Sequence, residues 1–146
     1  AVEELCLDAD IVIGAVLVPG ARAPQLVTDQ VVAAMRSGSV LVDLAVDQGG
    51  CFQSTRPTTH SDPTFEVSGS LFYCVPNMPG AVPHTSTYAL TNATLPYIGA
   101  IAGAGWRAAC VADAALALGV NTVAGSLVCR PVADAHGLPW LPLETL

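Results

Sequence analysis

The clearest sign of the architecture is the run Val40-Leu41-Val42-Asp43-Leu44-Ala45-Val46, which leads straight into Asp47-Gln48-Gly49-Gly50. Such a nearly continuous apolar run is typical of a strand that is buried on both faces of a parallel sheet. A second run of this kind extends from Asp10 to Val18. Between the two, apolar residues recur at helical spacing from Ala23 to Met35, and Ser37-Gly38 is expected to end that helix. Strand, helix and strand in this order predict a right-handed βαβ crossover.

The rest of the chain continues with one more strand and then helices. After a loop rich in Ser, Thr and Pro, the run Ser70 to Val75 predicts a third strand. From Thr85 onwards the pattern is helical, and Pro96 predicts a kink or a new helix start. Trp106 to Leu118 predicts another helix with Gly119 as its C-cap, and the tail after it is expected to be irregular.

These elements predict an α/β fold, namely the second half of a Rossmann-type doubly wound parallel sheet followed by C-terminal helices. The half-sheet would occupy residues 1–84 and the helical segment residues 85–146. Three strands are too few for an independent doubly wound sheet. The sequence also starts at Ala1 without a methionine, so we expect a fragment or a processed piece.

Composition excludes several classes of function. The net charge is −7, and the basic residues are five arginines with no lysine, which argues against a nucleic-acid surface. The apolar runs are far shorter than the roughly 20 residues of a transmembrane helix, and no signal-like segment is visible. Five cysteines and three histidines are scattered without zinc-binding spacing. We therefore expect a cytoplasmic globular protein with reduced thiols and no metal site.

Ligands of open α/β sheets bind outside the carboxyl ends of the strands, and three such ends are visible here. Val16-Leu17-Val18 is apolar, Val75-Pro76-Asn77-Met78 offers an amide beside a thioether, and the end at Val46 offers Asp47 and a glycine pair. Asp43 is placed inside its strand, so Asp47 is expected to be the only carboxylate at the crevice. It could act as an acid or a base or orient a water, or it could simply be an Asx-turn residue.

One glycine-rich segment, Gly103-Ala104-Gly105-Trp106-Arg107-Ala108, formally matches the GxGxxA pattern of dinucleotide-binding loops. Such a loop must follow a strand, whereas this one follows a helical stretch. We therefore reject it, and the sequence shows no other phosphate-binding loop.

Several motifs together resemble alanine dehydrogenase. The resemblance runs from about Ala9 to the C-terminus and is closest in the segments Val16 to Gly20, Val42 to Cys51, Arg56-Pro57-Thr58-Thr59, and Asn77-Met78-Pro79 through Thr85 to Thr94. The alpha subunit of proton-translocating pyridine nucleotide transhydrogenase shares this domain. It typically has an asparagine where this chain has Cys51. Asp47-Gln48 and the Arg-Pro-Thr-Thr loop also favour the dehydrogenase.

The resemblance implies an oxidoreductase of L-alanine catabolism, which converts L-alanine to pyruvate and ammonium while hydride passes to NAD. Asp47 would be its catalytic carboxylate, helping water attack the imino intermediate and shuttling protons. Residues 1–84 would then be the second half of an NAD-binding domain, and residues 85–146 would pack with an N-terminal substrate domain. The residues that the resemblance places around NAD are Val16 and Leu17; Leu44, Ala45, Val46 and Asp47, with Arg56 close by; and Val75, Pro76, Asn77 and Met78.

Other features of the family are missing from this sequence. Its substrate-binding arginine and lysine and its catalytic histidine belong to an N-terminal segment, as do the glycine-rich loop and the acidic residue that holds the adenosine ribose. Where some relatives have a glutamate and a histidine able to bind a cation, this chain has Ala100 and Ala104. We therefore expect the chain alone to be inactive, the missing half to be its partner, and the complete enzyme to be a homo-oligomer. A truncated non-catalytic product, a transhydrogenase-like NAD(H)-binding module and an unrelated α/β interaction domain remain as alternatives.

Overall fold

The computed structural model describes residues 1–145, which fall into two compact units. The first unit is Ala1–Ala81, and the second begins at Val82. This boundary lies three residues before the one that the sequence pattern places between residues 84 and 85. Each unit is described separately below.

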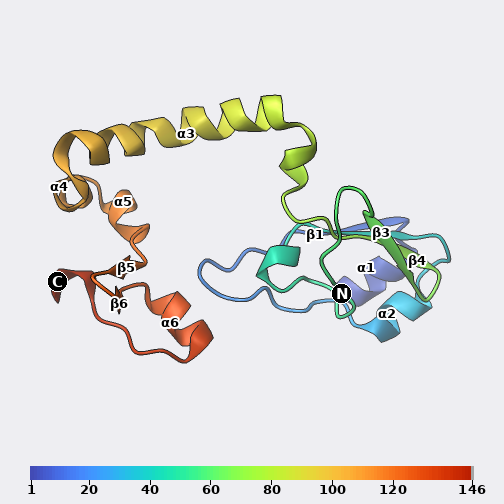
Figure 1. The fold of residues 1–146 in the computed structure, drawn as a ribbon. Helices are drawn as coiled ribbons and strands as arrows, with labels where there is room; N and C mark the ends of the chain where they lie inside the picture. Colours follow the sequence, from blue (N-terminus) through green and yellow to red (C-terminus); the bar gives the residue numbers. More distant parts are fainter. Residues whose placement is uncertain (146) are drawn as a thin grey trace. The chain divides into compact units, whose positions relative to one another are not determined.

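The first unit is built on a four-stranded sheet with the order β1-β2-β4-β3 (Figure 1). Three strands run parallel: β1 (Ile11–Gly14), β2 (Val40–Asp43) and β4 (Ser70–Tyr73). Within the described residues β1 is an edge strand, as expected for the first strand of a half-sheet. The α/β fold with a parallel half-sheet is thus confirmed.

The fourth strand, β3 (Thr64–Val67), was not predicted from the sequence. It pairs antiparallel with β4 through a two-residue turn, Ser68-Gly69, in which both residues have positive φ. Positive φ at both central positions is the geometry of a type I′ hairpin turn, which matches the twist of the flanking strands. The alternating pattern on both sides of Ser68-Gly69 was the signal that could have revealed this hairpin.

All three parallel strands end earlier than their apolar runs. β1 ends at Gly14 rather than Val18, β2 at Asp43 rather than Val46, and β4 at Tyr73 rather than Val75. The ladder between β1 and β2 ends with the pair Gly14 and Asp43, after which the described part of the chain forms no further pair of these strands. The segment that follows β2 forms a short 3-10 helix, η1 (Val46–Gln48), instead of continuing the strand.

The crossover helix, α2 (Asp29–Ala34), is shorter than the predicted helix from Ala23 to Met35. Thr28 caps it, since its hydroxyl oxygen accepts a hydrogen bond from the N–H of Val31. The preceding residue, Val27, forms a bridge with Phe52 and is thereby held in an extended conformation. The start predicted at Ala23 was therefore wrong, because a tertiary contact outweighs the apolar spacing.

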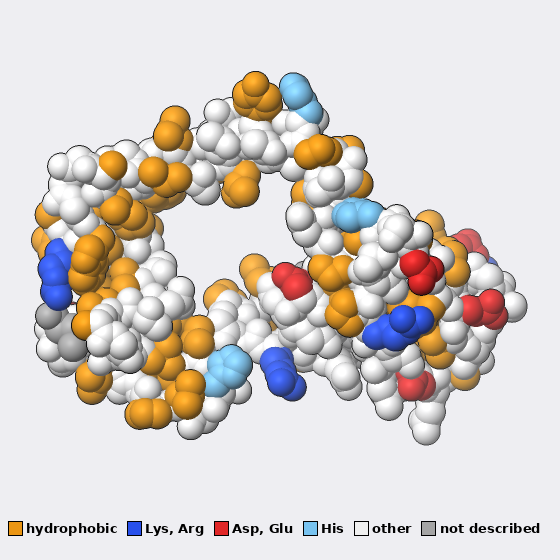
Figure 2. Space-filling model, viewed as in Figure 1, with side chains coloured by type: hydrophobic (Ala, Val, Ile, Leu, Met, Phe, Trp, Pro, Cys, Tyr) orange, Lys and Arg blue, Asp and Glu red, His pale blue; other side chains and the backbone are white. Residues whose placement is uncertain are grey.

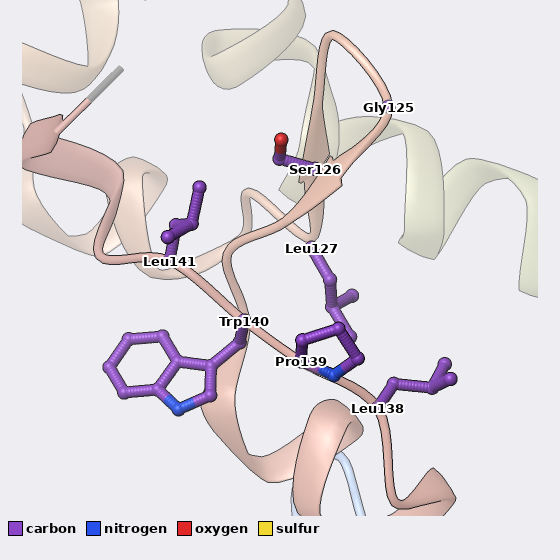
Figure 3. Close-up of a pocket in the computed structure, with 7 residues that line it drawn as sticks. All are labelled: Gly125, Ser126, Leu127, Leu138, Pro139, Trp140 and Leu141. Atoms are coloured by element: carbon purple, nitrogen blue, oxygen red, sulfur yellow. The ribbon is translucent and has the colours of Figure 1, made fainter.

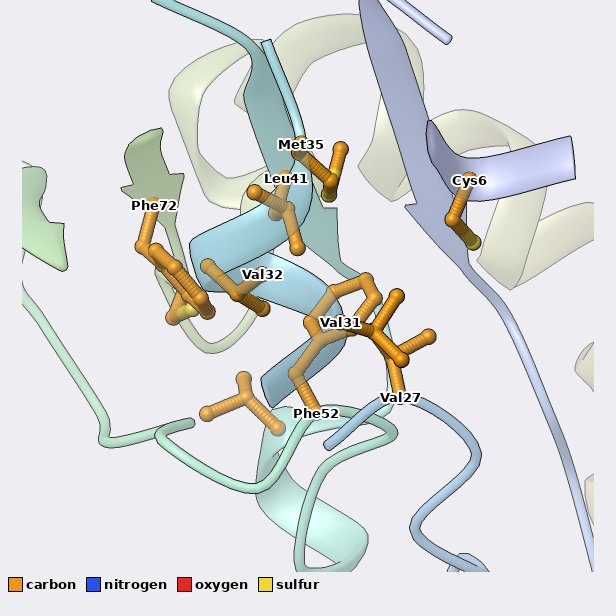
Figure 4. Close-up of a cluster of buried hydrophobic side chains, with 10 residues drawn as sticks. Cys6, Val27, Val31, Val32, Met35, Leu41, Phe52 and Phe72 are labelled. Carbon is orange, nitrogen blue, oxygen red and sulfur yellow. The ribbon is translucent and has the colours of Figure 1, made fainter. Parts of the chain in front are cut away.

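The core lies on the face of the sheet that α2 and the N-terminal helix α1 (Val2–Asp8) cover, and Figure 4 shows its side chains. Phe72 of β4 is fully buried in this core, with its ring edge-on to Phe52 and stacked on Phe65. The buried members of this cluster are Cys6, Val27, Val31, Val32, Met35, Leu41, Val46, Phe52, Phe72 and Cys74.

The opposite face of the sheet is open within the described residues. Ile11, Ile13 and Leu71 point to this face and are exposed, whereas Val12, Leu41 and Phe72 alternate with them toward the core. The expectation of strands buried on both faces was therefore wrong for this chain. The side chains on the open face are nevertheless apolar, as in parallel sheets that are covered on both sides.

The second unit is mainly helical. It opens with α3 (Pro83–Ala104), which runs through Pro96 rather than restarting there. The predicted helix from Trp106 to Leu118 is two helices, α4 (Trp106–Ala112) and α5 (Ala114–Leu118). Asp113 separates them, because its carboxylate accepts hydrogen bonds from the first backbone N–H groups of α5. Gly119 follows α5 as its C-cap, as predicted.

The tail is more regular than the sequence suggested. It contains a small hairpin of β5 (Thr122–Val123) and β6 (Ser126–Leu127), followed by α6 (Arg130–His136) and the 3-10 turn η3 (Leu143–Thr145). A proline in the first turn and Gly137 with φ 63° at the end delimit α6. Proline at the start and glycine after the end are a known pair of helix signals, and they were missed here.

Helix α3 carries no charged residue, and its large hydrophobic side chains are exposed (Figure 2). They include Tyr88, Leu90, Leu95 and Ile98. No helix among the described residues is both long and apolar enough to cross a membrane.

Candidate cofactor and catalytic site

Parallel pairing brings three of the segments singled out in the sequence to one edge of the sheet. The carboxyl ends of β1, β2 and β4 are neighbours, so the residues that follow Gly14, Asp43 and Tyr73 leave the sheet on the same side. This is the edge where open α/β sheets bind their ligands. The rejected GxGxxA segment lies instead at the junction of α3 and α4, where it follows a helix.

The eleven predicted site residues differ in their accessibility. Leu17 and Leu44 are 67% and 50% exposed, which leaves an apolar surface beside the strand ends. Three of the eleven have side chains turned into the interior, so only their backbone is available to a ligand. The exposed residues are Leu17, Leu44, Asp47, Arg56 and Asn77; the half-buried ones are Val16, Pro76 and Met78; the buried ones are Ala45, Val46 and Val75.

Asp47 lies in η1 and is exposed at this edge. Gly49 follows in the left-handed conformation, with φ 104°, and ends the turn. Within residues 1–145 the Asp47 carboxylate accepts no hydrogen bond, so the Asx-turn interpretation does not hold. A carboxylate that is free and accessible is suited to take part in proton transfer.

Asp43 is the second carboxylate of this region, and its role was not predicted from the sequence. It is the last residue of β2 and is 0% exposed. Its Oδ1 accepts a hydrogen bond from the N–H of Ala45 at 2.9 Å. Its Oδ2 accepts one from the N–H of Cys51 at 2.8 Å and one from the Thr55 hydroxyl at 2.5 Å. Hydrogen bonds of this kind satisfy a buried charge, so Asp43 is closed off from a ligand and Asp47 is the accessible carboxylate.

Close packing around Asp43 depends on two glycines. A Cβ at Gly50, whose φ is +81°, would lie 2.4 Å from a side-chain carbon of Thr55 and 2.8 Å from the Asp43 Oδ2. A Cβ at Gly14 would lie 2.8 Å from the Cβ of Cys51. Any larger residue at either position would therefore push the segment after β2 away from the strand ends.

Two buried thiols lie in the same region. Burial raises the pKa of the Cys51 thiol above its ordinary value, and the negative charge of Asp43 adds to the effect. For Cys74, burial followed by the Asp43 charge raises the pKa to about 11. Both thiols therefore stay protonated at neutral pH and are unsuited to nucleophilic chemistry.

We expect the thiol of Cys74 to be alkylated slowly in the folded protein. A pKa raised from 9.0 to about 11 lowers the thiolate fraction at pH 8 by about 100-fold, before steric protection is added. Iodoacetamide labelling followed by peptide mass spectrometry measures the rate, with the same chain in urea as the control. The rate should rise steadily up to pH 11. Equal labelling of Cys74 in the folded and unfolded chain at pH 8 would contradict the assignment.

Arg56 is the one cation among the predicted site residues. Its guanidinium carbon lies 4.1 Å from the centre of the Phe65 ring, a cation–π contact that holds the exposed side chain over β3. The described residues include no group of three or more His, Cys, Asp or Glu side chains that could hold a metal ion.

A separate pocket of about 470 Å³ lies in the second unit, beside the β5–β6 hairpin (Figure 3). Its lining is largely apolar and contains no acidic or basic side chain, so it offers no proton-transfer group. The residues that line it are Gly125, Ser126, Leu127, Leu138, Pro139, Trp140 and Leu141.

Comparison with known proteins gives consistent matches. Over residues 1–130 the chain matches the family described as alanine dehydrogenase/PNT, C-terminal domain. It is 59% identical over 138 residues to the alanine dehydrogenase of Mycolicibacterium smegmatis, which covers 94% of this chain and 37% of that protein. A solved L-alanine dehydrogenase superposes with a TM-score of 0.76 at 52% identity, covering 93% of this chain and 37% of the other. The transhydrogenase from Sinorhizobium meliloti gives a TM-score of 0.55 at 34% identity, covering 60% of this chain and 25% of the other.

The matches to curated relatives cover nearly all of this chain but only part of each relative. The chain spans between 36% and 39% of the length of the curated relatives that it matches.

Proposed function

The chain belongs to the family of the alanine dehydrogenase/PNT C-terminal domain, and on this premise we propose that it supplies the nicotinamide side of the NAD site in an L-alanine dehydrogenase. The reaction converts L-alanine, water and NAD to pyruvate, ammonium, NADH and a proton. The observation that carries the proposal is the accessible Asp47 carboxylate at the carboxyl edge of the sheet, between apolar strand ends. The test is alanine-dependent reduction of NAD, followed by absorbance, with the native full-length polypeptide. A pure, folded protein that binds NAD but reduces none with alanine would overturn the proposal.

The residues present fit the cofactor. The exposed side chains of Leu17 and Leu44 offer an apolar surface at two neighbouring strand ends, where a nicotinamide ring can pack. Val16, Pro76 and Met78 would add half-buried contacts, while the interior residues Ala45, Val46 and Val75 would contribute only backbone. Arg56 and Asn77 would supply polar contacts. NAD, when bound, accepts the hydride that leaves the α-carbon of alanine.

Asp47 would move the protons of the reaction. Loss of hydride leaves an iminium at the substrate carbon, and water adds to that carbon when a base removes its proton. The Asp47 carboxylate is an accessible base at this edge. The proton that it takes up can then be returned to the nitrogen. As the C–N bond breaks and the C=O bond of pyruvate forms, the carboxylate takes the hydroxyl proton, and the departing ammonia is protonated to ammonium. General acid–base assistance of this kind contributes about 10²–10⁴-fold to rate.

The remaining chemistry would come from outside this sequence. The chain has no lysine, so the family's substrate-binding lysine belongs to the length of the relatives that this chain does not span. We propose that residues 85–146 pack against the substrate domain, and that the complete enzyme is a homo-oligomer. The uncharged, exposed surface of α3 supports a packing role. Five free cysteines fit a reducing compartment, so we place the protein in the cytoplasm.

A transhydrogenase module is the second candidate, since the family includes both activities and one solved transhydrogenase shares the fold. The alanine dehydrogenase structure superposes better and over more of the chain. A product assay separates the two, because only the dehydrogenase forms pyruvate from alanine.

We expect Leu17→Asp to weaken NAD binding by about 10–100-fold. The substitution places an unpaired charge against the apolar part of the cofactor, and desolvating that charge is costly. Isothermal titration of the native polypeptide with NAD measures the change. Leu5→Asp is the matched control, because Leu5 is 75% exposed on α1, which precedes the opposite end of β1. Equal NAD affinity in both folded variants would rule out Leu17 as a contact.

A further inference from the structure

The segment that carries Asp47 is hydrogen-bonded at both ends to one buried carboxylate, that of Asp43. It leaves β2 at Asp43, and the N–H of Ala45 donates at once to Oδ1 of that residue. Eight residues after Asp43 the chain returns, and the N–H of Cys51 donates to Oδ2. The Thr55 hydroxyl donates to the same Oδ2 at 2.5 Å. A single side chain therefore holds the start and the end of residues 44–55.

The interior of this segment is fixed by backbone bonds as well. The N–H of Ala23 donates to the carbonyl of Gln48 at 2.8 Å, and the N–H of Leu26 donates to that of Cys51 at 2.8 Å. These bonds join the segment to residues 23–26. At its start, the N–H of Leu44 donates to the carbonyl of Gly14 at the end of β1, at 2.8 Å. Among the hydrogen bonds of the described residues, those to the Asp43 carboxylate join the far end of the segment, Cys51 and Thr55, to the end of β2.

We propose that Asp43 is a positioning residue, which fixes the Asp47 carboxylate through its hydrogen bonds to Ala45, Cys51 and Thr55. The proposal rests on the function proposed above, and it assigns to Asp43 no contact with substrate or cofactor. Asp47 lies on η1, inside the segment that the three bonds close. A general base must stay within hydrogen-bond reach of its proton, so a displacement of about 1 Å can cost about 100-fold in rate.

Both packing and charge support this assignment. A fully buried carboxylate is costly unless its oxygens are satisfied, so each of the three donors is also needed for Asp43 to remain in place. Gly50 leaves no spare room beside the carboxylate, since a Cβ there would lie 2.8 Å from Oδ2. The carboxylate and the segment therefore constrain one another.

The test removes one donor at a time. Thr55→Val keeps the shape of the side chain and deletes the hydroxyl, and Thr55→Ser restores it. The matched control is Thr58→Val, because Thr58 is also half-buried and its hydroxyl donates to the carbonyl of Pro63 at 2.9 Å, away from Asp43. Asp43→Asn is the second variant. The amide nitrogen of the asparagine cannot accept a hydrogen bond, yet it must face at least one of the three donors.

Two measurements are made on the native full-length polypeptide. In the first, kcat for alanine-dependent NAD reduction should fall about 10-fold in Thr55→Val and about 10–100-fold in Asp43→Asn. Thr55→Ser should recover most of the rate, and Thr58→Val should leave it unchanged. In the second, backbone hydrogen exchange of residues 44–55 should become at least about 10-fold faster in Thr55→Val and Asp43→Asn only.

The outcomes separate this proposal from the proposed function. If the unsubstituted protein shows no alanine-dependent activity, the proposed function fails, and hydrogen exchange alone decides whether Asp43 fixes residues 44–55. If exchange of these residues is the same in all variants, the positioning role is overturned. It is also overturned if Thr55→Val and Thr58→Val lower kcat equally, because the loss would then be a general effect on stability.

Discussion

Asp47→Asn is expected to lower the rate of alanine oxidation by about 10²–10⁴-fold in the native polypeptide. The amide has the shape of the carboxylate and can still hydrogen-bond a water, but it cannot take up a proton. Because Asp47 makes no hydrogen bond within residues 1–145, its replacement should leave the fold intact. Steady-state kinetics at saturating NAD measure the loss, which should appear in kcat.

The matched control is Asp10→Asn. Asp10 is also an exposed carboxylate, but it precedes β1 and so lies at the opposite end of the strands. Its ion pair with Arg36, at 3.7 Å, is on the surface and contributes little to stability. A near-normal rate in Asp47→Asn would refute the catalytic assignment, and an equal loss in Asp10→Asn would show that the effect is not specific to the site.

Phe72→Ala is expected to lower the free energy of unfolding by about 3–5 kcal/mol. Phe72 is 0% exposed in the parallel strand β4, and its ring contacts those of Phe52 and Phe65 at centroid distances of 5.9 and 5.1 Å. Truncation removes these contacts and leaves a cavity between the sheet and the Cys51-Phe52 segment. Denaturant unfolding followed by circular dichroism measures the change.

Leu71→Ala is the matched control for this prediction. Leu71 is the neighbouring residue of β4, but it points to the open face and is 40% exposed. Its truncation should cost less than about 1 kcal/mol, since the side chain already contacts water. Equal shifts of the unfolding midpoint in the two variants would contradict the assignment of the core to one face.

The elements that the sequence revealed best are those with strong local patterns. The apolar runs around Val12, Leu41 and Phe72 predicted three parallel strands, because strands of a parallel sheet are rich in apolar residues. The carboxyl edge of these strands, and Asp47 at that edge, followed from the same pattern. The hairpin turn at Ser68-Gly69 and the cap at Thr28 were visible in the sequence but were not recognised.

The lengths of the strands were decided by tertiary structure and not by the apolar pattern. Ala15 to Val18 and Leu44 to Val46 are as apolar as the strands that they follow. The ladder between β1 and β2 ends with the pair Gly14 and Asp43 and with the bond from the Leu44 N–H to the Gly14 carbonyl, after which the carbonyls of Ala45 and Val46 accept hydrogen bonds within a turn instead. Apolar composition reports burial, whereas a strand also needs a neighbour to bond with.

What the sequence by itself determined about this protein is the α/β half-sheet and the edge at which its polar residues gather. The roles of its two aspartates, Asp43 and Asp47, were decided only by the tertiary structure. They lie four residues apart in one stretch, and the local pattern placed Asp47 at the edge and Asp43 inside the strand without showing what Asp43 does there. The chain buries Asp43 because Cys51 and Thr55 return from further along to donate to it, and it leaves Asp47 exposed on the turn between. Hydrogen bonds between residues distant in sequence are set by the packing of the whole unit, and for that reason they separate a structural carboxylate from an accessible one.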